Sequence, residues 1–205
     1  MFKNIIFDFD GVILDSVPVK TEAFKKLFND YPFDKVKELI LYHEKNGGKS
    51  RYVKIKYFFE SILEEKIDEK KILLLANEYS LLTREELSKE KYLILDSVQF
   101  IKKNYNNLNM HIASGADEND LKYICDKLGL TQYFFSINGS PLVKDKIVAN
   151  IITDNNYCTN DTILIGDSIN DYDAAKLNRI RFFGYNNKYL KKVSDIYIKD
   201  FRSLI

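Results

Sequence analysis

The chain lacks the features that mark secreted and membrane-bound proteins. Its 205 residues include only two cysteines, Cys125 and Cys158, which form no CxxC pair and no metal-like spacing. We therefore expect two reduced thiols and no disulfide. No apolar run approaches the roughly 18 residues that a membrane-spanning helix needs. A strand is expected directly after residues 1–3, which leaves no room for a signal peptide, so we predict a cytoplasmic protein.

An excess of charge of one sign is also absent. The chain has 31 Lys and Arg against 30 Asp and Glu, a net charge of +1. Because no global field attracts nucleic acid or an anionic membrane, neither is expected as a partner. The length suits one domain with a substantial core, or one domain that carries a smaller inserted one. No heptad repeat indicates a coiled coil, and a monomer or small homo-oligomer is expected.

Short apolar runs alternate with helical patterns at the start of the chain and from residue 93 onward. Strands are expected at residues 5–9, 108–113, 134–138, 162–165 and 180–183. Helical spacing fills residues 96–103, 118–128, 146–153 and 171–177. This alternation predicts an α/β fold with a doubly wound, Rossmann-like parallel sheet.

Residues 17–92 have a different pattern. They show amphipathic helical periodicity almost throughout and no convincing strand. We therefore predict a core formed by residues 1–16 and 93–205, and an all-helical cap domain of residues 17–92 inserted after the first strand.

Two groups of aspartates follow apolar strands. Asp8 and Asp10 lie at the end of the first strand, and Asp167 and Asp171 follow the strand at 162–165. Ligands of parallel sheets bind at the carboxyl ends of strands, so these carboxylates converge if the two strands are neighbours. Clustered anions need a cation, and an all-oxygen site suits Mg²⁺. Turn formation and helix capping are the alternatives.

Two further motifs offer donors to a phosphate group. Ser114-Gly115 lies just past a third strand and before a helix, where a hydroxyl and free N–H groups can hold phosphate oxygens, or where a simple turn can form. Lys144 and Lys146 precede another helix. Either lysine can neutralise carboxylates and a phosphoryl group, or lie solvated on the surface.

In this order the motifs resemble those of the haloacid dehalogenase-like (HAD) hydrolase superfamily. The resemblance covers essentially the whole chain and is carried by DFDGV at 8–12, SG at 114–115, a lysine, and GDS at 166–168 with Asp171. The helical insertion resembles the cap of the branch that contains β-phosphoglucomutase and phosphoglycolate phosphatase.

The resemblance implies a role for each motif residue. Asp8 is the nucleophile that forms an aspartyl phosphate, and Asp10 is the general acid and base. Asp8, the backbone carbonyl of Asp10 and Asp167 are implied ligands of Mg²⁺, and Asp171 either adds a ligand or supports the others. Ser114 hydrogen-bonds the phosphoryl group.

The lysine motif departs from the pattern of many relatives, which have KPxP where this chain has PLVKDK. We favour Lys144 and keep Lys146 as the alternative, because charge neutralisation requires only that an ammonium reach the site. Asp10 favours phosphate esters, since relatives that cleave halides or phosphonates lack this aspartate. Lys20 stands where the mutase branch carries a histidine, which weakens a mutase prediction.

The sequence GKSR at 48–51 resembles the substrate loop of the same branch. The resemblance implies that Arg51 contacts the leaving group, with Lys49 and His43 as helpers. Arg51 in an exposed salt bridge is the alternative. Lys20 is predicted to be a helix-surface charge and His43 to lie on a polar helix face.

We therefore predict a Mg²⁺-dependent phosphatase that acts on a small phosphate ester through an aspartyl-phosphate intermediate. A sugar, polyol or amino-alcohol phosphate is the preferred substrate class, and the sequence does not identify the ester. A phosphomutase and a catalytically idle phosphate-binding regulatory protein are the alternatives.

Overall fold

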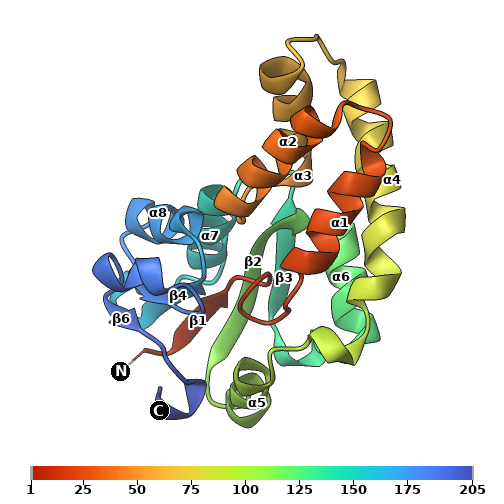
Figure 1. The fold of residues 1–205 in the computed structure, drawn as a ribbon. Coiled ribbons are helices and arrows are strands. Elements are labelled where there is room, and N and C mark those ends of the chain that lie inside the picture. The colour runs from red at the N-terminus through yellow and green to blue at the C-terminus, as the bar shows by residue number, and fades with distance from the viewer. Residues whose placement is uncertain (1, 205) are drawn as a thin grey trace.

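The computed structural model describes residues 2–204 and is built around one parallel sheet (Figure 1). Six strands run in the order β3-β2-β1-β4-β5-β6, and every neighbouring pair is parallel. Their bounds are β1 Asn4–Phe7, β2 Asn109–Asp117, β3 Ser136–Ser140, β4 Thr162–Gly166, β5 Arg181–Gly184 and β6 Ile196–Tyr197. The predicted α/β fold is confirmed, whereas β6, with two residues, was not predicted.

Helices cover both faces of the sheet, because residues along each strand alternate between them. Ile5 and Phe7 of β1 point into a core shared with helices α5 (Leu95–Asn104) and α6 (Glu118–Lys127). Ile6, between them, packs with α7 (Lys144–Asp154) and α8 (Ile169–Leu177) on the opposite face. All three side chains are fully buried.

The segment between β1 and α5 contains four α-helices and no strand. They are α1 (Val17–Leu27), α2 (Phe33–Lys45), α3 (Arg51–Tyr57) and α4 (Glu69–Leu87). These helices have a core of their own, in which the rings of Phe28 and Phe58 lie 4.3 Å apart. The four helices form a layer over one end of the sheet (Figure 1). We call residues 17–92 the helical segment.

The two chain connections to the helical segment run side by side. The Ile94 N–H donates to the Ile13 carbonyl (2.9 Å), and the Asp15 N–H donates to the Tyr92 carbonyl (2.8 Å). Shorter helical turns lie at Phe58–Ile62, Glu90–Tyr92, Thr131–Tyr133, Thr159–Asp161, Lys188–Lys192 and Phe201–Ser203. Within residues 2–204, we find no helix with the length and apolar character to cross a membrane.

Candidate active site

The central position of β1 brings the acidic motifs together. Phe7, its last residue, pairs with Ile112 of β2 on one side and with Ile165 of β4 on the other. Asp8 follows β1 at once and Asp167 follows β4. Both aspartates therefore lie at the same edge of the sheet, as expected for the carboxyl ends of neighbouring parallel strands.

Asp8, Asp167 and Asp171 form an acidic cluster. Each offers a ligand atom, and these atoms lie within 4.8 Å of one another. Burial, with Asp171 nearby, raises the pKa of Asp8 to about 7. Burial and the neighbouring Asp8 raise the pKa of Asp167 to about 8. Three carboxylates gathered this closely provide the oxygen donors that Mg²⁺ prefers, and a divalent cation offsets their repulsion.

Gly11 makes room for this cluster. Its φ of +74° lies in the left-handed region, and a Cβ atom there would come within 2.0 Å of the Asp167 carboxylate. Only glycine fits this turn without displacing Asp167.

Lys144, at the start of α7, is the cation of the cluster. Its Nζ lies 2.8 Å from Asp8 Oδ1 and also donates a hydrogen bond to Asp171. Burial works to lower the pKa of Lys144, but the carboxylates of Asp171 and Asp8 outweigh it and raise the pKa. Lys146 is exposed. The structure therefore brings Lys144, not Lys146, to the acidic cluster.

Asp171 has two kinds of partner. It is buried beside Lys144, and its other oxygen accepts hydrogen bonds from the Ser168 N–H (2.9 Å) and hydroxyl (2.6 Å) at the start of α8. Asp171 therefore caps α8 and also belongs to the acidic cluster. The sequence analysis treated these two roles as alternatives.

The carboxylate of Asp10 pairs with Lys20 of the helical segment and not with Lys144. Its carboxylate accepts hydrogen bonds from the Ser16 hydroxyl and from Lys20 Nζ, both at 2.5 Å. Burial works against ionisation, but Lys20 and the hydrogen bonds outweigh it and lower the pKa of Asp10. The prediction of Lys20 as a helix-surface charge was wrong, because α1 turns this residue toward the end of β1.

Ser114 and Gly115 lie within β2, where the pairing with β3 shifts after Ala113. Ser114 is fully buried, and its hydroxyl accepts a hydrogen bond from the Ala116 N–H (3.1 Å). A Cβ atom on Gly115 would lie 2.2 Å from the carbonyl oxygen of Gly48. The loop before α3 therefore touches the sheet edge backbone to backbone.

Arg51 is not an exposed salt-bridge residue. Its guanidinium is buried 2.7 Å from the Asp120 carboxylate of α6 and donates hydrogen bonds to the Ala76 carbonyl (3.2 Å) and the Ser80 hydroxyl. The pairing crosses from the helical segment to the sheet layer. Tyr52 makes a second crossing contact, a 2.6 Å hydrogen bond from its hydroxyl to Asp117.

His43 lies inside the helical segment, so its prediction on a polar helix face was wrong. The ring is 3% exposed, and its Nδ1 is 2.9 Å from Nζ of Lys54. Sequence reasoning missed Lys54, although its spacing of three from Arg51 places both on one side of α3. Lys49 lies over the ring of Tyr42, 5.4 Å from its centroid.

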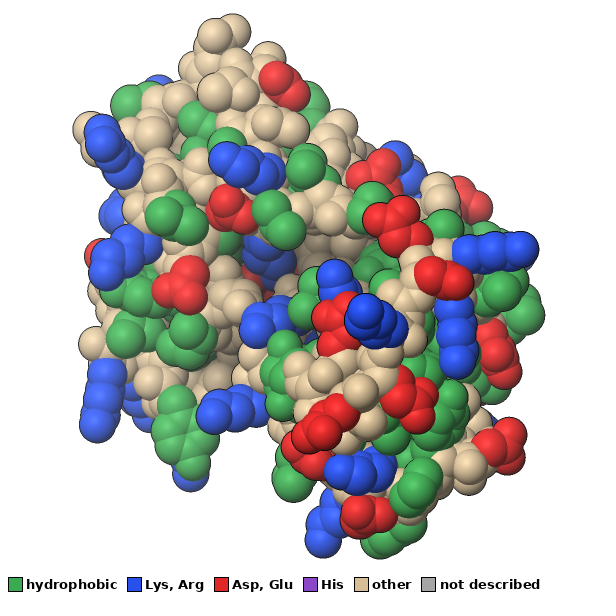
Figure 2. Space-filling view, turned by 90° about the horizontal axis from the view of Figure 1, so that it is seen from above, with side chains coloured by type: hydrophobic (Ala, Val, Ile, Leu, Met, Phe, Trp, Pro, Cys, Tyr) green, Lys and Arg blue, Asp and Glu red, His purple; other side chains and the backbone are tan. Residues whose placement is uncertain are grey.

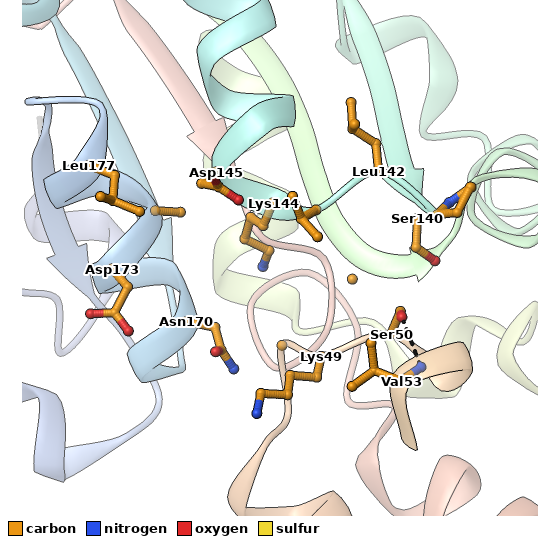
Figure 3. Close-up of a pocket in the computed structure, with 15 residues that line it drawn as sticks. Lys49, Ser50, Val53, Ser140, Leu142, Lys144, Asp145, Asn170, Asp173 and Leu177 are labelled. Carbon is orange, nitrogen blue, oxygen red and sulfur yellow. Dashed lines mark hydrogen bonds between the residues drawn. The ribbon is translucent and has the colours of Figure 1, made fainter. Parts of the chain in front are cut away.

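Two cavities flank the loop Gly47–Ser50. The larger, about 230 Å³, lies between this loop and the start of α7, with Lys49 and Lys144 on opposite walls (Figure 3). The smaller, about 20 Å³, lies over Asp10. Small cavities lined by charged side chains, Lys49 and Lys144 in the larger and Asp10 in the smaller, suit a small polar ligand.

Comparisons with known proteins identify the family and the fold. The model of the haloacid dehalogenase-like hydrolase family matches residues 5–185. A comparison with curated proteins gives no match.

Solved structures share the fold over almost the whole chain. β-Phosphoglucomutase from Clostridium difficile has a TM-score of 0.81 at 18% identity, over 100% of this chain and 94% of its own. A predicted phosphoglycolate phosphatase from Haemophilus somnus 129pt has a TM-score of 0.77 at 15% identity, over 99% and 96%. The HAD-hydrolase YfnB from Bacillus subtilis, bound to magnesium, has a TM-score of 0.73 at 18% identity, over 99% and 96%. With a family match along residues 5–185, the chain belongs to the haloacid dehalogenase-like hydrolases.

Proposed function

We propose that the protein is a Mg²⁺-dependent phosphatase of small phosphate esters that works through an aspartyl phosphate on Asp8. One observation carries the proposal: three buried or half-buried carboxylates gather at the carboxyl ends of β1 and β4, and one lysine pairs with two of them. Their summed charge favours a divalent cation, and the same surroundings favour a phosphoryl group held between cation and lysine.

The residues that would hold Mg²⁺ are Asp8 and Asp167, with the Asp10 backbone carbonyl and Asp171 as further candidates. Bound there, the ion would neutralise charge on the phosphoryl oxygens. The relative YfnB is described as bound to magnesium, which supports this choice of metal.

Two displacements at phosphorus complete the proposed reaction. A carboxylate oxygen of Asp8 forms a bond to phosphorus as the bond to the leaving oxygen breaks, and that oxygen receives a proton from Asp10. Water then attacks the aspartyl phosphate, gives a proton to Asp10 and releases inorganic phosphate and free Asp8. Lys144 and Ser114 hold the phosphoryl oxygens during both steps.

The partners of Asp10 suit the second step. Lys20 and Ser16 stabilise the ionised carboxylate, which is the form that accepts a proton from water. In the first step Asp10 must carry a proton, which it takes from solvent before it passes this proton to the leaving oxygen. Lys20 is therefore proposed as a positioning residue that tunes the general acid and base.

The helical segment is proposed to act as a cap that covers the site. Its loop Gly47–Ser50 touches β2, and the two cavities beside this loop, of about 230 and 20 Å³, have the size for a small ligand. A small phosphorylated metabolite, such as a sugar, polyol or amino-alcohol phosphate, fits this arrangement better than a protein-sized substrate.

Phosphate release from p-nitrophenyl phosphate tests the proposal. We expect turnover with Mg²⁺, loss of turnover with EDTA, and recovery when Mg²⁺ is added in excess. Phosphate release that is unaffected by EDTA would remove the metal from the proposal. A protein that binds inorganic phosphate without hydrolysing any ester would be an idle binding protein.

A phosphomutase is the second candidate, favoured by the TM-score of 0.81 to β-phosphoglucomutase. Such an enzyme returns the phosphoryl group to a sugar phosphate instead of to water. Incubation with a sugar 1-phosphate distinguishes the two: isomerised sugar phosphate identifies a mutase, and stoichiometric free phosphate identifies a phosphatase.

A further inference from the structure

Helix α4 carries apolar side chains on two opposite sides. One side packs against α1, α3 and α6. Its buried residues are Ala76, Tyr79, Thr83 and Leu87. With about 3.6 residues per turn, Leu74 and Leu81 lie on the opposite side, and they are 60% and 74% exposed. Leu73 and Leu82, also exposed, flank them, and we call these four leucines the outer face of α4.

The outer face of α4 lies at the border of the molecule. In Figure 1, α4 forms the right-hand border of the helical segment, and the other helices of this segment lie on its inner side. Seen from above, the same border shows hydrophobic side chains among Lys, Arg, Asp and Glu side chains (Figure 2). Single exposed leucines are common on protein surfaces. Four on the outer side of one helix, where polar residues are expected, indicate an interaction surface.

Opposite charges lie at the two ends of the outer face. Lys70 precedes Leu74 by one turn, and Glu85 follows Leu81 by one turn. Both charged side chains are exposed, and among residues 2–204 neither forms an ion pair. A complementary partner must therefore be apolar in the middle, acidic opposite Lys70 and basic opposite Glu85.

A second copy of α4 that runs antiparallel to the first meets all three requirements. A two-fold axis beside the middle of the helix, at residues 77–78, places Leu74 of each copy opposite Leu81 of the other. The same axis brings Lys70 of each copy to the end that carries Glu85 of the other. In a parallel pair Lys70 would meet Lys70 and Glu85 would meet Glu85, and these like charges would repel.

We propose that the protein forms a two-fold symmetric dimer in solution through the outer faces of two antiparallel α4 helices. The 19 residues of α4 span about 28 Å, so the pair buries less surface than the roughly 1,600 Å² of a standard interface. The two Glu78 carboxylates lie beside the axis and repel each other, which lowers the affinity further. We therefore expect a weak dimer, with a Kd on the order of 10 µM.

The dimer is independent of the proposed function. Tyr79, on the inner side of α4, lines the cavity over Asp10, so the outer face points away from the active site. Dimerisation and phosphate release can therefore succeed or fail separately.

Sedimentation velocity of the complete protein between about 1 and 200 µM tests the proposal. We expect the mean mass to rise from one protomer toward two over this range. A monomer at every concentration would overturn the proposal, whether or not the protein hydrolyses phosphate esters. A mass that continues to rise beyond two protomers would also overturn it, because a two-fold interface closes after two copies.

Substitution of a leucine then locates the interface. Leu81→Glu should raise Kd at least about tenfold, because it places a carboxylate within the apolar contact. Leu41→Glu is the matched control, because Leu41 is 59% exposed on α2 and lies outside the outer face. This control should change Kd by less than about twofold. Thermal unfolding checks that both variants are folded, and an equal effect of the two substitutions on Kd would reject the outer face.

Exchange of charges tests the antiparallel direction. Lys70→Glu and Glu85→Lys should each raise Kd about threefold or more, because each dimer then contains two contacts between like charges. An equimolar mixture of the two variants should associate about as tightly as the original protein, since the mixed pair has an acid opposite a base at both ends. Glu85 also accepts a hydrogen bond from the Tyr123 hydroxyl (2.6 Å), and the mixture lacks half of these bonds as well. No recovery in the mixture would exclude the antiparallel pair, and the inference would be wrong.

Discussion

The two sides of the site differ in charge and in how that charge is balanced. The sheet side gathers Asp8, Asp167 and Asp171, and the ammonium of Lys144 pairs with two of them, Asp8 and Asp171. The helical side lines the smaller cavity with four cations, Lys20, Lys49, Arg51 and Lys54. Lys20 pairs with Asp10, and Arg51 pairs with Asp120. One side thus lacks a cation and the other lacks an anion. This contrast suggests that the chemistry belongs to the sheet and the selection of substrate to the helices.

Removal of Asp8 should disable the sheet side alone. We expect Asp8→Asn to lower kcat by about 10⁴-fold or more, because no other carboxylate takes the place of the nucleophile. The melting temperature without metal should stay equal or rise, since the substitution removes repulsion from Asp171. Phosphate release and thermal unfolding measure both effects. Asp126→Asn, at an exposed position of α6, is the control, and equal activity of the two variants would exclude the proposed mechanism.

Lys144 and Lys146 provide the next comparison. Lys144→Met should lower kcat/KM by about 10²- to 10³-fold, because the phosphoryl oxygens lose a preorganised cation. The melting temperature should fall as well, because Asp8 and Asp171 lose their shared partner. Lys146 lies at an exposed position two residues away. Lys146→Met should therefore change kcat/KM by no more than about twofold and should leave the melting temperature unchanged. The reverse order of effects would assign the role to Lys146.

The Arg51–Asp120 pair tests how firmly the two sides are joined. Asp120→Asn leaves the Arg51 guanidinium buried without its counter-charge and should cost about 3–5 kcal/mol of unfolding free energy. Urea unfolding of Asp120→Asn, Arg51→Met and the double variant gives the coupling between them. We expect the double variant to be more stable than the sum of the single losses predicts. Simple additivity would mean that the pair contributes nothing across the boundary.

Buried His111 of β2 should give the sheet side a weaker but measurable sensitivity to acid. Its ring bonds to Ser136 (2.8 Å) and Tyr157 (2.9 Å), and burial lowers its pKa from 6.5 to about 4. Between these values the unfolded chain binds the proton and the folded chain does not, so stability falls as the pH falls. From pH 7 to pH 5 the loss is about 2 kcal/mol.

His111→Asn should abolish this part of the acid sensitivity. Urea unfolding at pH 7 and pH 5 should therefore show about 2 kcal/mol less loss in the variant than in the original protein. The acidic cluster titrates in both proteins and cancels in the difference. An identical pH dependence in the two proteins would contradict the assignment to His111.

Sequence reasoning reached the sheet side because its signals are local. Apolar runs such as Thr162–Gly166 define the strands, and an aspartate placed directly after a strand must lie at the sheet edge whatever the details of packing. The same reasoning predicts from the sequence alone that Asp8 and Asp167 lie close together. Boundaries differed slightly: β1 ends at Phe7, two residues before the predicted end, and β6 is too short to give a pattern.

The helical side resisted prediction because its contacts join elements distant in sequence. Lys54 of α3 contacts His43 of α2. Arg51 pairs with Asp120, which lies 69 residues further along the chain. Helical periodicity says which face of a helix is apolar, but not which charged residue of another element lies opposite it. Lys20 and His43 were therefore placed on the surface, whereas docking of the helices buries His43 beside Lys54 and leaves Lys20 half-buried beside Asp10.

The contact between Gly48 and Gly115 limits how this active site can vary. Where the loop before α3 meets β2, main chain lies against main chain, and a methyl group at position 115 would overlap the Gly48 carbonyl. A larger residue at position 115 would push the loop before α3 away from the sheet. New substrate preferences can thus arise by exchange of the lysines around the loop. Position 115, where the loop contacts β2, must remain glycine.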